Sequence, residues 1–361
     1  MLRVTIAEWA EQDGVELNPR SLDGVEQAQR DGIMDMFKQR GIPGLSRTGE
    51  PTAASSHADP LRPSAPPRHL LSSLLRHAAD SKCEELCRGA SADDRIRLLS
   101  AAGPTAGTCF AAHLSFEGVH FSDRSWTTAV KFRLGVGQPG PQLHCANTTA
   151  AGELCNKVLC EHADHAVECP CGPLRNQRHD NLAYIYADIF EEVGGIARRE
   201  LFVPELSGKR EAWLDVWALG IQELPDPLLD VSVRHPRAPR YRPGSEQRPG
   251  AAASKAEEVK RDRYPAKAGR EVWPIVHETW GRLGEEAEAL LHACAAAAAR
   301  RAHRRGRTAG GELRRWRAKL DGALQRAVAA QLNAARHGLP GRPRRKQQPW
   351  DLAVLECRPD S

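Results

Sequence analysis

The sequence has few aromatic residues and no long apolar run. Aromatic side chains make up 5% of the 361 residues, and methionine occurs three times. The longest strictly apolar run, the alanine-rich segment 293–299, is far shorter than the roughly 20 residues that cross a bilayer. The N-terminus carries Glu8 where a secretory signal would continue its apolar stretch. We therefore expect a nuclear or cytoplasmic protein that neither spans a membrane nor is secreted.

Lysine and arginine are unevenly distributed along the chain. There are 51 of them against 46 acidic residues, yet residues 300–346 hold 15 and only two acids. A basic segment on a mildly acidic body is typical of proteins that bind polyanions, although a solvated basic helix is the alternative. We expect the region 271–346 to be a basic helical tail that binds DNA, or alternatively RNA. The arginines expected to contact phosphates there are Arg314, Arg315 and Arg317.

The residue pattern divides the chain into six regions. Residues 1–68 have no recognisable pattern and end in a linker rich in Ser, Thr, Ala and Pro, whereas residues 69–135 carry apolar side chains at helical spacing. The length is sufficient for two or three compact units. The remaining regions are a Cys/His-rich segment, an α/β segment, the basic tail and a C-terminal tail, at 140–175, 176–270, 271–346 and 347–361.

The α/β segment begins with an amphipathic helix. Apolar residues recur from Leu182 to Val193 at i, i+3, i+4, i+7 and i+11, and two glycines then end the helix. The order helix, strand, strand, strand, helix matches the first elements of a restriction-endonuclease-like α/β core. The runs that follow the first helix predict three strands, at 196–203, 213–219 and 228–235, and three further helices, at 254–264, 271–305 and 312–337.

A cluster of cysteine and histidine indicates a zinc site. Five of the ten cysteines lie within 27 residues, together with two histidines. Without an export signal, such thiols stay reduced and free to coordinate a metal. The preferred ligands are Cys145, Cys155, His165 and Cys169, because the short His-x3-Cys spacing lets the start of a helix present two ligands to one ion. The exact set stays open, since three other residues are candidates: Cys160, His162 and Cys171.

Two aspartates occupy the middle of predicted apolar strands. Asp215 lies in Trp-Leu-Asp-Val-Trp, and Asp230 lies in Leu-Leu-Asp-Val-Ser-Val. A carboxylate in mid-strand is disfavoured by propensity and costly if it is buried without a partner. Two of them on successive strands therefore indicate a shared divalent ion such as Mg²⁺, of the kind that assists phosphodiester cleavage. Acids at strand edges that face solvent are the alternative.

A cation is expected beside these two acids, because a lysine stabilises the charge that develops on a phosphate during cleavage. Lys260 shares one helical face with Tyr264 on the helix that follows the strands, and Lys255 is an alternative. A solvated helix charge is the simpler interpretation of Lys260 taken alone. Glu200 in the first strand, or Glu205 just after it, is a further candidate for the metal.

Five motifs in this order resemble the C-terminal region of site-specific non-LTR retrotransposon proteins that carry a restriction-enzyme-like endonuclease. The resemblance covers about residues 140–265 and includes no reverse transcriptase, so the chain looks like a piece of a larger element. Leu214 stands where the family usually has proline. The matching motifs are His165-x3-Cys169, Arg178-His179-Asp180, Leu214-Asp215-Val216, Asp230-Val231-Ser232-Val233 and Lys260-x3-Tyr264.

The resemblance implies a zinc-containing nucleic-acid-binding protein with a restriction-like endonuclease domain that nicks DNA with Mg²⁺. Arg178 and His179 would then contact nucleic acid. A zinc and basic-helix binding module without catalytic activity is the second hypothesis, and an interaction protein that binds no nucleic acid is the third. The catalytic residues implied are Asp215 and Asp230, which would hold Mg²⁺, with Lys260, Tyr264 and Glu200.

Overall fold

The computed structural model describes residues 81–112, 119–136, 143–207, 211–221, 224–264, 271–301 and 308–338. The chain divides into two compact units, Met1–Arg68 and His69–Ser361, and every described residue belongs to the second. The predictions made for residues 1–68, for the start of the region 69–135 and for residues 347–361 lie outside the described residues.

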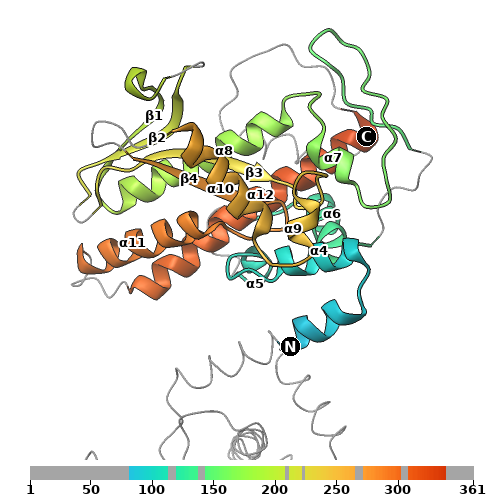
Figure 1. Cartoon of the computed structure of the whole chain (residues 1–361), viewed down its shortest axis with the longest axis horizontal. Coiled ribbons are helices and arrows are strands. Elements are labelled where there is room, and N and C mark those ends of the chain that lie inside the picture. Colours follow the sequence, from blue (N-terminus) through green and yellow to red (C-terminus); the bar gives the residue numbers. More distant parts are fainter. Residues whose placement is uncertain are drawn as a thin grey trace, which may run out of the picture. The chain divides into compact units, whose positions relative to one another are not determined.

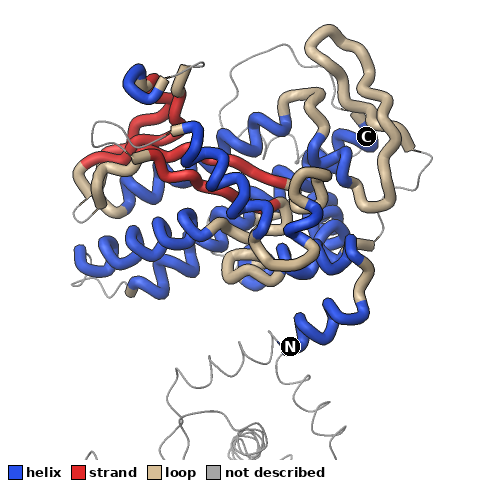
Figure 2. The backbone as a smooth tube through the Cα atoms, viewed as in Figure 1, coloured by secondary structure: helices blue, strands red, loops and turns tan. Residues whose placement is uncertain are grey.

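A four-stranded mixed sheet forms the core of the second unit (Figures 1 and 2). β1 pairs antiparallel with β2, β2 antiparallel with β3, and β3 parallel with β4. The three strands expected from the sequence form within one residue of their predicted ends, so the α/β class is confirmed. The strands, in order across the sheet, are β1 (Ile196–Phe202), β2 (Trp213–Leu219), β3 (Leu228–Arg234) and β4 (Val272–Glu278).

Strand β4 corrects the prediction of one continuous helix over 271–305. The helix in this region, α11 (Glu285–Arg301), begins only after a turn at Gly281, and the residues before the turn form an edge strand of the sheet. Pro274 explains the difference. Its ring would clash with the preceding turn of a helix and it has no N–H to donate, whereas the outer edge of a sheet tolerates both properties.

Helices cover both faces of the sheet (Figure 1). On one face Ile275 joins the buried side chains of α8 (Leu174–Glu192) and α11. On the other face Ala253 and Ala256 of α10 (Ala251–Arg263) pack against Val276. The shorter elements are α4 (Ala92–Ala101), α5 (Thr108–Ala111), α6 (Asp123–Leu134), α7 (Asp164–Glu168), η1 (Pro204–Leu206) and α9 (Arg242–Ser245).

Helix α12 (Ala309–His337) is a core helix. It contacts α5, α6, α7, α8 and α11, and in Figure 1 it runs behind the sheet. Apolar side chains at every fourth position are fully buried and form the stripe that packs inward: Trp316, Leu320, Leu324, Val328 and Leu332. The described part of the predicted basic tail, from β4 to α12, therefore belongs to the same core as the α/β segment.

Two buried carboxylates satisfy the N-termini of helices on the α10 side. Glu278, at the end of β4, accepts a hydrogen bond of 3.2 Å from the backbone N–H of Ala253 in the first turn of α10. Glu257 of α10 accepts one from the backbone of Glu286 at the start of α11. Burial raises the pKa of Glu257 to about 7, even though that hydrogen bond and Arg261 oppose the shift. The helix ends are thus capped by residues distant in sequence.

Glu257 makes stability depend on pH. Its pKa rises from 4.5 to about 7 on folding, so the stability is fully present below about pH 4.5 and declines as the pH rises through 7. We expect Glu257→Gln to raise the melting temperature by several degrees at pH 8 and to change it little at pH 5. Glu258→Gln, at an exposed position on the same helix, is the control and should shift neither value. A Glu257→Gln protein that melts below wild type at pH 8 would contradict this assignment.

Candidate functional site

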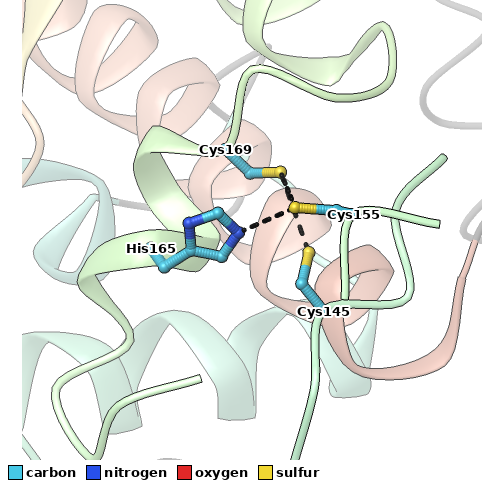
Figure 3. A group of neighbouring side chains, drawn as sticks. All are labelled: Cys145, Cys155, His165 and Cys169. Atoms are coloured by element: carbon cyan, nitrogen blue, oxygen red, sulfur yellow. Dashed lines mark hydrogen bonds between the residues drawn. The ribbon is translucent and has the colours of Figure 1, made fainter. Parts of the chain in front are cut away.

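Three cysteines and one histidine converge on one point (Figure 3). The ligand atoms of Cys145, Cys155, His165 and Cys169 all lie within 4.8 Å of one another. The Sγ–Sγ distances are 3.7 Å for two cysteine pairs, and Cys155 Sγ lies 3.3 Å from His165 Nε2. A tetrahedral zinc site has edges of about 3.8 Å between sulfurs and about 3.5 Å between sulfur and nitrogen. The group can therefore hold a metal such as zinc with little rearrangement.

Two local structures present these ligands. His165 lies in the short helix α7, and Cys169 is its C-cap residue, so the expected His-x3-Cys helix forms. Cys145 and Cys155 lie on a ribbon in which backbone hydrogen bonds of 2.8 Å join Cys145 to Lys157 and Cys155 to Asn147. The alternative candidates lie outside the group. Cys160 Sγ accepts the Asp164 N–H at 3.3 Å, and His162 Nε2 lies 3.5 Å from Asp93. Cys171 interacts with Cys155 and Cys169 without being one of the four converging groups.

The electrostatics favour metal binding at His165 and Cys155, whereas burial raises the pKa of the Cys145 thiol to about 12. Burial and the charge of Lys157 lower the pKa of His165, so its imidazole is neutral at pH 7 and has a lone pair to offer. Burial acts to raise the pKa of Cys155, but hydrogen bonds from the Lys157 backbone and from neighbouring thiols outweigh it and lower the pKa. Deprotonated sulfur and neutral imidazole are the forms that coordinate zinc.

The cluster of Cys145, Cys155, His165 and Cys169 is tied to the end of the sheet. Asp164, which precedes the ligand His165, accepts hydrogen bonds from His235 Nε2 at 2.8 Å and pairs with Arg237 Nε at 2.9 Å. His235 follows the last residue of β3 and is held from its other side by Thr279 at 2.8 Å. Both His235 and Arg237 are buried. One hydrogen-bond network thus fixes both the helix that presents His165 and the end of β3.

A second cluster lies where strands β2 and β3 separate. The last paired residues there are Val216 and Leu229, and one step beyond them stand Asp215 and Asp230, which would oppose each other if the pairing continued. Instead, the Asp215 carboxylate accepts the backbone N–H of Val231 at 2.6 Å. We call the place marked by Asp215 and Asp230 the strand fork. Their side chains are 18% and 16% exposed, so solvent reaches both acids.

Lys260 reaches the strand fork from α10. Its Nζ donates to the carboxylate of Asp230, to the Asp230 carbonyl at 2.9 Å and to the Val231 carbonyl at 3.4 Å. Burial lowers the pKa of Lys260, although the charge of Asp230 opposes the shift. Tyr264 at the end of α10 is buried too, and burial and then the charge of Asp230 raise its pKa. The fold therefore brings Asp215, Asp230, Lys260 and Tyr264 together.

His179 of α8 reaches the same place from the other side. Its Nε2 lies 3.2 Å from an Asp215 oxygen, and its Nδ1 lies 3.1 Å from Asp180. Burial would lower the pKa of His179, but the two carboxylates raise it to about 10, so the ring is protonated at neutral pH. The sequence singled out His179 as a nucleic-acid contact and offered no signal for this pairing, because only the packing of α8 on the sheet joins it to Asp215.

Two other expected site residues have different positions. Glu200 has a left-handed backbone with φ 53°, and its side chain is 79% exposed, lies 3.8 Å from Arg199 and makes no hydrogen bond or ion pair with Asp215 or Asp230 among the described residues. Arg178 is 5% exposed and donates to Gln331 of α12 at 2.7 Å. Arg178 was expected to contact nucleic acid. Its guanidinium is instead buried and joins α8 to α12 inside the protein.

The three arginines expected to contact phosphates differ in their surroundings. Arg315 pairs with Glu192 and with Glu312, and Arg317 pairs with Glu288. These two hold α12 against α8 and α11. Arg314 is exposed and points to solvent. Arg314 can therefore contact a polyanion directly. Arg315 and Arg317 would each have to give up an ion pair to do so.

Comparisons of the chain with protein-family models, with curated proteins and with solved structures found no match. Among the described residues, no helix is both long and apolar enough to cross a membrane.

We expect the purified protein to contain about one zinc, because four protein ligands complete a structural site. His165→Ala and Cys169→Ser should each lose the metal and lower the melting temperature, since zinc binding contributes directly to folding. Cys160→Ser is the matched control and should keep the zinc, because its sulfur only accepts the Asp164 N–H among the contacts described. Elemental analysis measures the metal content. Well-folded wild-type protein without zinc would contradict the prediction.

Proposed function

We propose that this protein is a zinc-stabilised nucleic-acid-binding protein whose strand fork cleaves phosphodiester bonds, in an arrangement like that of restriction endonucleases. One observation carries the proposal. Asp215 and Asp230 each stand one residue beyond the last paired residues of β2 and β3, and Lys260 reaches Asp230 from α10. Two acids on neighbouring strands and a lysine that reaches one of them are the kinds of group that metal-assisted phosphodiester cleavage uses.

The free oxygens of the two acids support a divalent-metal site. Asp215 Oδ2 and Asp230 Oδ1 are engaged by protein groups, whereas Asp215 Oδ1 and Asp230 Oδ2 have no hydrogen bond to a described residue. Asp215 and Asp230 would hold Mg²⁺ through these oxygens. When bound there, the ion would polarise a phosphate and lower the pKa of a water molecule.

The remaining groups have roles that follow from their positions. Lys260 holds Asp230 and places a positive charge beside it, where the charge on a cleaved phosphate develops. His179 holds Asp215 in the fork while donating to it as a cation. Residues 140–175, with the zinc cluster, orient the end of β3 through Asp164 and His235. The motif order that resembles retrotransposon endonucleases agrees with these roles.

A second function has an observation in its favour. Each acid of the strand fork is already neutralised by a cation, Asp215 by His179 and Asp230 by Lys260. Such pairs are stable without any metal, which favours a binding module in which the acids only hold α8 and α10 on the sheet. Under this alternative the protein binds nucleic acid and leaves it intact.

Nicking of a supercoiled plasmid separates the two functions. We expect wild type to nick with Mg²⁺ and not with EDTA, and Asp215→Asn and Asp230→Asn to abolish nicking. Lys260→Ala should lower the rate on the order of 10²-fold. Asp262→Asn, at an exposed position on α10, is the control and should cut like wild type. Absence of metal-dependent cleavage, or equal cleavage by the Asp variants, would leave the binding module as the function.

Binding through α12 is tested with two neighbouring arginines. Arg314→Gln should weaken binding to any DNA sequence and reduce the slope of log affinity against log salt by about 1, as expected for one lost phosphate contact. Arg315→Gln should instead lower the melting temperature, because it breaks ion pairs with Glu192 and Glu312. Fluorescence anisotropy over a salt series gives the slopes. Equal slopes for wild type and Arg314→Gln would place the contact elsewhere.

A further inference from the structure

Arg234, the last residue of β3, is a partly buried cation without a partner. Its Nε is buried and makes no hydrogen bond, and no ion pair or ring contact of its guanidinium with a described residue is found. Five other arginines also have a buried Nε without a hydrogen bond, yet each has a partner for its guanidinium: Arg178, Arg199, Arg237, Arg317 and Arg336. Among the described arginines whose Nε is buried without a hydrogen bond, Arg234 is the one without a partner for its guanidinium.

Arg234 lies near two other cations, while its register partner on β4, Glu278, accepts a hydrogen bond from the start of α10. The charge of Arg234 acts with burial to lower the pKa of Lys260, and it acts in the same sense on Arg178. The acids of the strand fork do not compensate for it, because Asp215 is engaged by His179 and Asp230 by Lys260. A gathering of like charges costs free energy unless an anion joins it.

The start of α8 adds one more cation. Arg175 lies in its first turn, which contains no acid, and no side chain caps the helix, whereas His179 is already paired with Asp215 and Asp180. Positive side chains at the N-terminus of a helix oppose the helix dipole, which favours anions there. Arg175 is exposed, and burial together with the charges of Arg175 and Arg234 lowers the pKa of Arg178, so both arginines lie near Arg178.

Ser232 provides an uncharged donor at the same place. Side chains two residues apart point to the same face of a strand, so Asp230, Ser232 and Arg234 share one face of β3. Ser232 is 6% exposed, and its hydroxyl has no hydrogen-bond partner. A buried hydroxyl without a partner is unusual and calls for a ligand or another explanation.

We infer that Arg234, with Ser232 and Arg175, forms a phosphate-binding subsite beside the strand fork. The ligand is a phosphate group of a nucleic-acid backbone, an identity that rests on the proposed function. Arg234 would bind the phosphate next to the one that Lys260 faces, and Arg175 would extend the contact towards solvent. Arg234 is thus a positioning residue, which holds the strand relative to Asp215 and Asp230.

Inorganic phosphate is the first probe, because its binding does not depend on cleavage. Thermal unfolding of the full chain is followed over a phosphate series at pH 7.5, with chloride at matched ionic strength as the reference. We expect phosphate to stabilise wild type beyond chloride, and Arg234→Gln to weaken phosphate binding by about tenfold or more. Arg248→Gln, an exposed arginine outside the strand fork, should bind phosphate like wild type.

Two further variants keep the test decisive if Arg234→Gln folds poorly. Arg175→Gln changes an exposed side chain and should weaken phosphate binding severalfold, and Arg234→Lys should restore part of the affinity because it keeps the charge. Zinc content reports that each variant is folded. No phosphate effect beyond chloride in wild type, or equal phosphate affinity in wild type, Arg234→Gln and Arg175→Gln, would overturn the subsite.

The proposed cleavage and the proposed phosphate subsite can be tested independently of each other. If Asp215→Asn loses nicking and still binds phosphate, both the proposed function and the subsite stand. If wild type binds phosphate through Arg234 and cuts nothing, the subsite stands and the nuclease does not. In an active protein, Arg234→Gln should raise KM for a short duplex more than it lowers kcat, because a positioning contact is lost while the acids remain. A change confined to kcat would overturn the positioning role.

Discussion

The burial of α12 is the constraint on which the rest of the second unit depends. This helix contacts elements from α5 to α11, and its stripe of apolar side chains has no other place to be removed from water. Gln331 on the same helix binds Arg178 of α8 at 2.7 Å and the Val167 carbonyl of α7 at 3.3 Å. The helix therefore fixes α8, which carries His179, and α7, which carries His165 of the Cys/His cluster, relative to each other.

The zinc cluster and the strand fork are two ends of one connected structure. Asp164 joins the helix that presents His165 to His235, which directly follows β3, the strand of Asp230. Loss of the metal would free α7 and with it one support of that strand. A metal bound at the Cys/His cluster would thus have a direct physical path to the arrangement of the two acids.

The strand fork combines exposure with charge pairing. A sheet that kept its pairing past Val216 would bring Asp215 and Asp230 directly opposite each other, and like charges in that position repel. The separation of the strands avoids this contact, since Asp215 accepts the Val231 N–H that a strand partner would otherwise take. The same opening admits solvent, and therefore any ligand, to both carboxylates. The end of regular β2–β3 pairing at Val216 and Leu229 therefore both avoids charge repulsion and exposes the two carboxylates.

Local patterns were sufficient for some features and failed for others. Alternating and β-branched runs predicted β1, β2 and β3, and the spacing of His165 and Cys169 predicted their helix, because these signals lie within a few residues. Pro274 was a local signal for β4 that the apolar pattern of 271–305 concealed. The burial of Arg178, the ion pairs of Arg315 and the meeting of His179 with Asp215 join residues far apart in the chain. Such contacts depend on how helices pack on the sheet, and a pattern within one segment contains no information about which distant segment will face it.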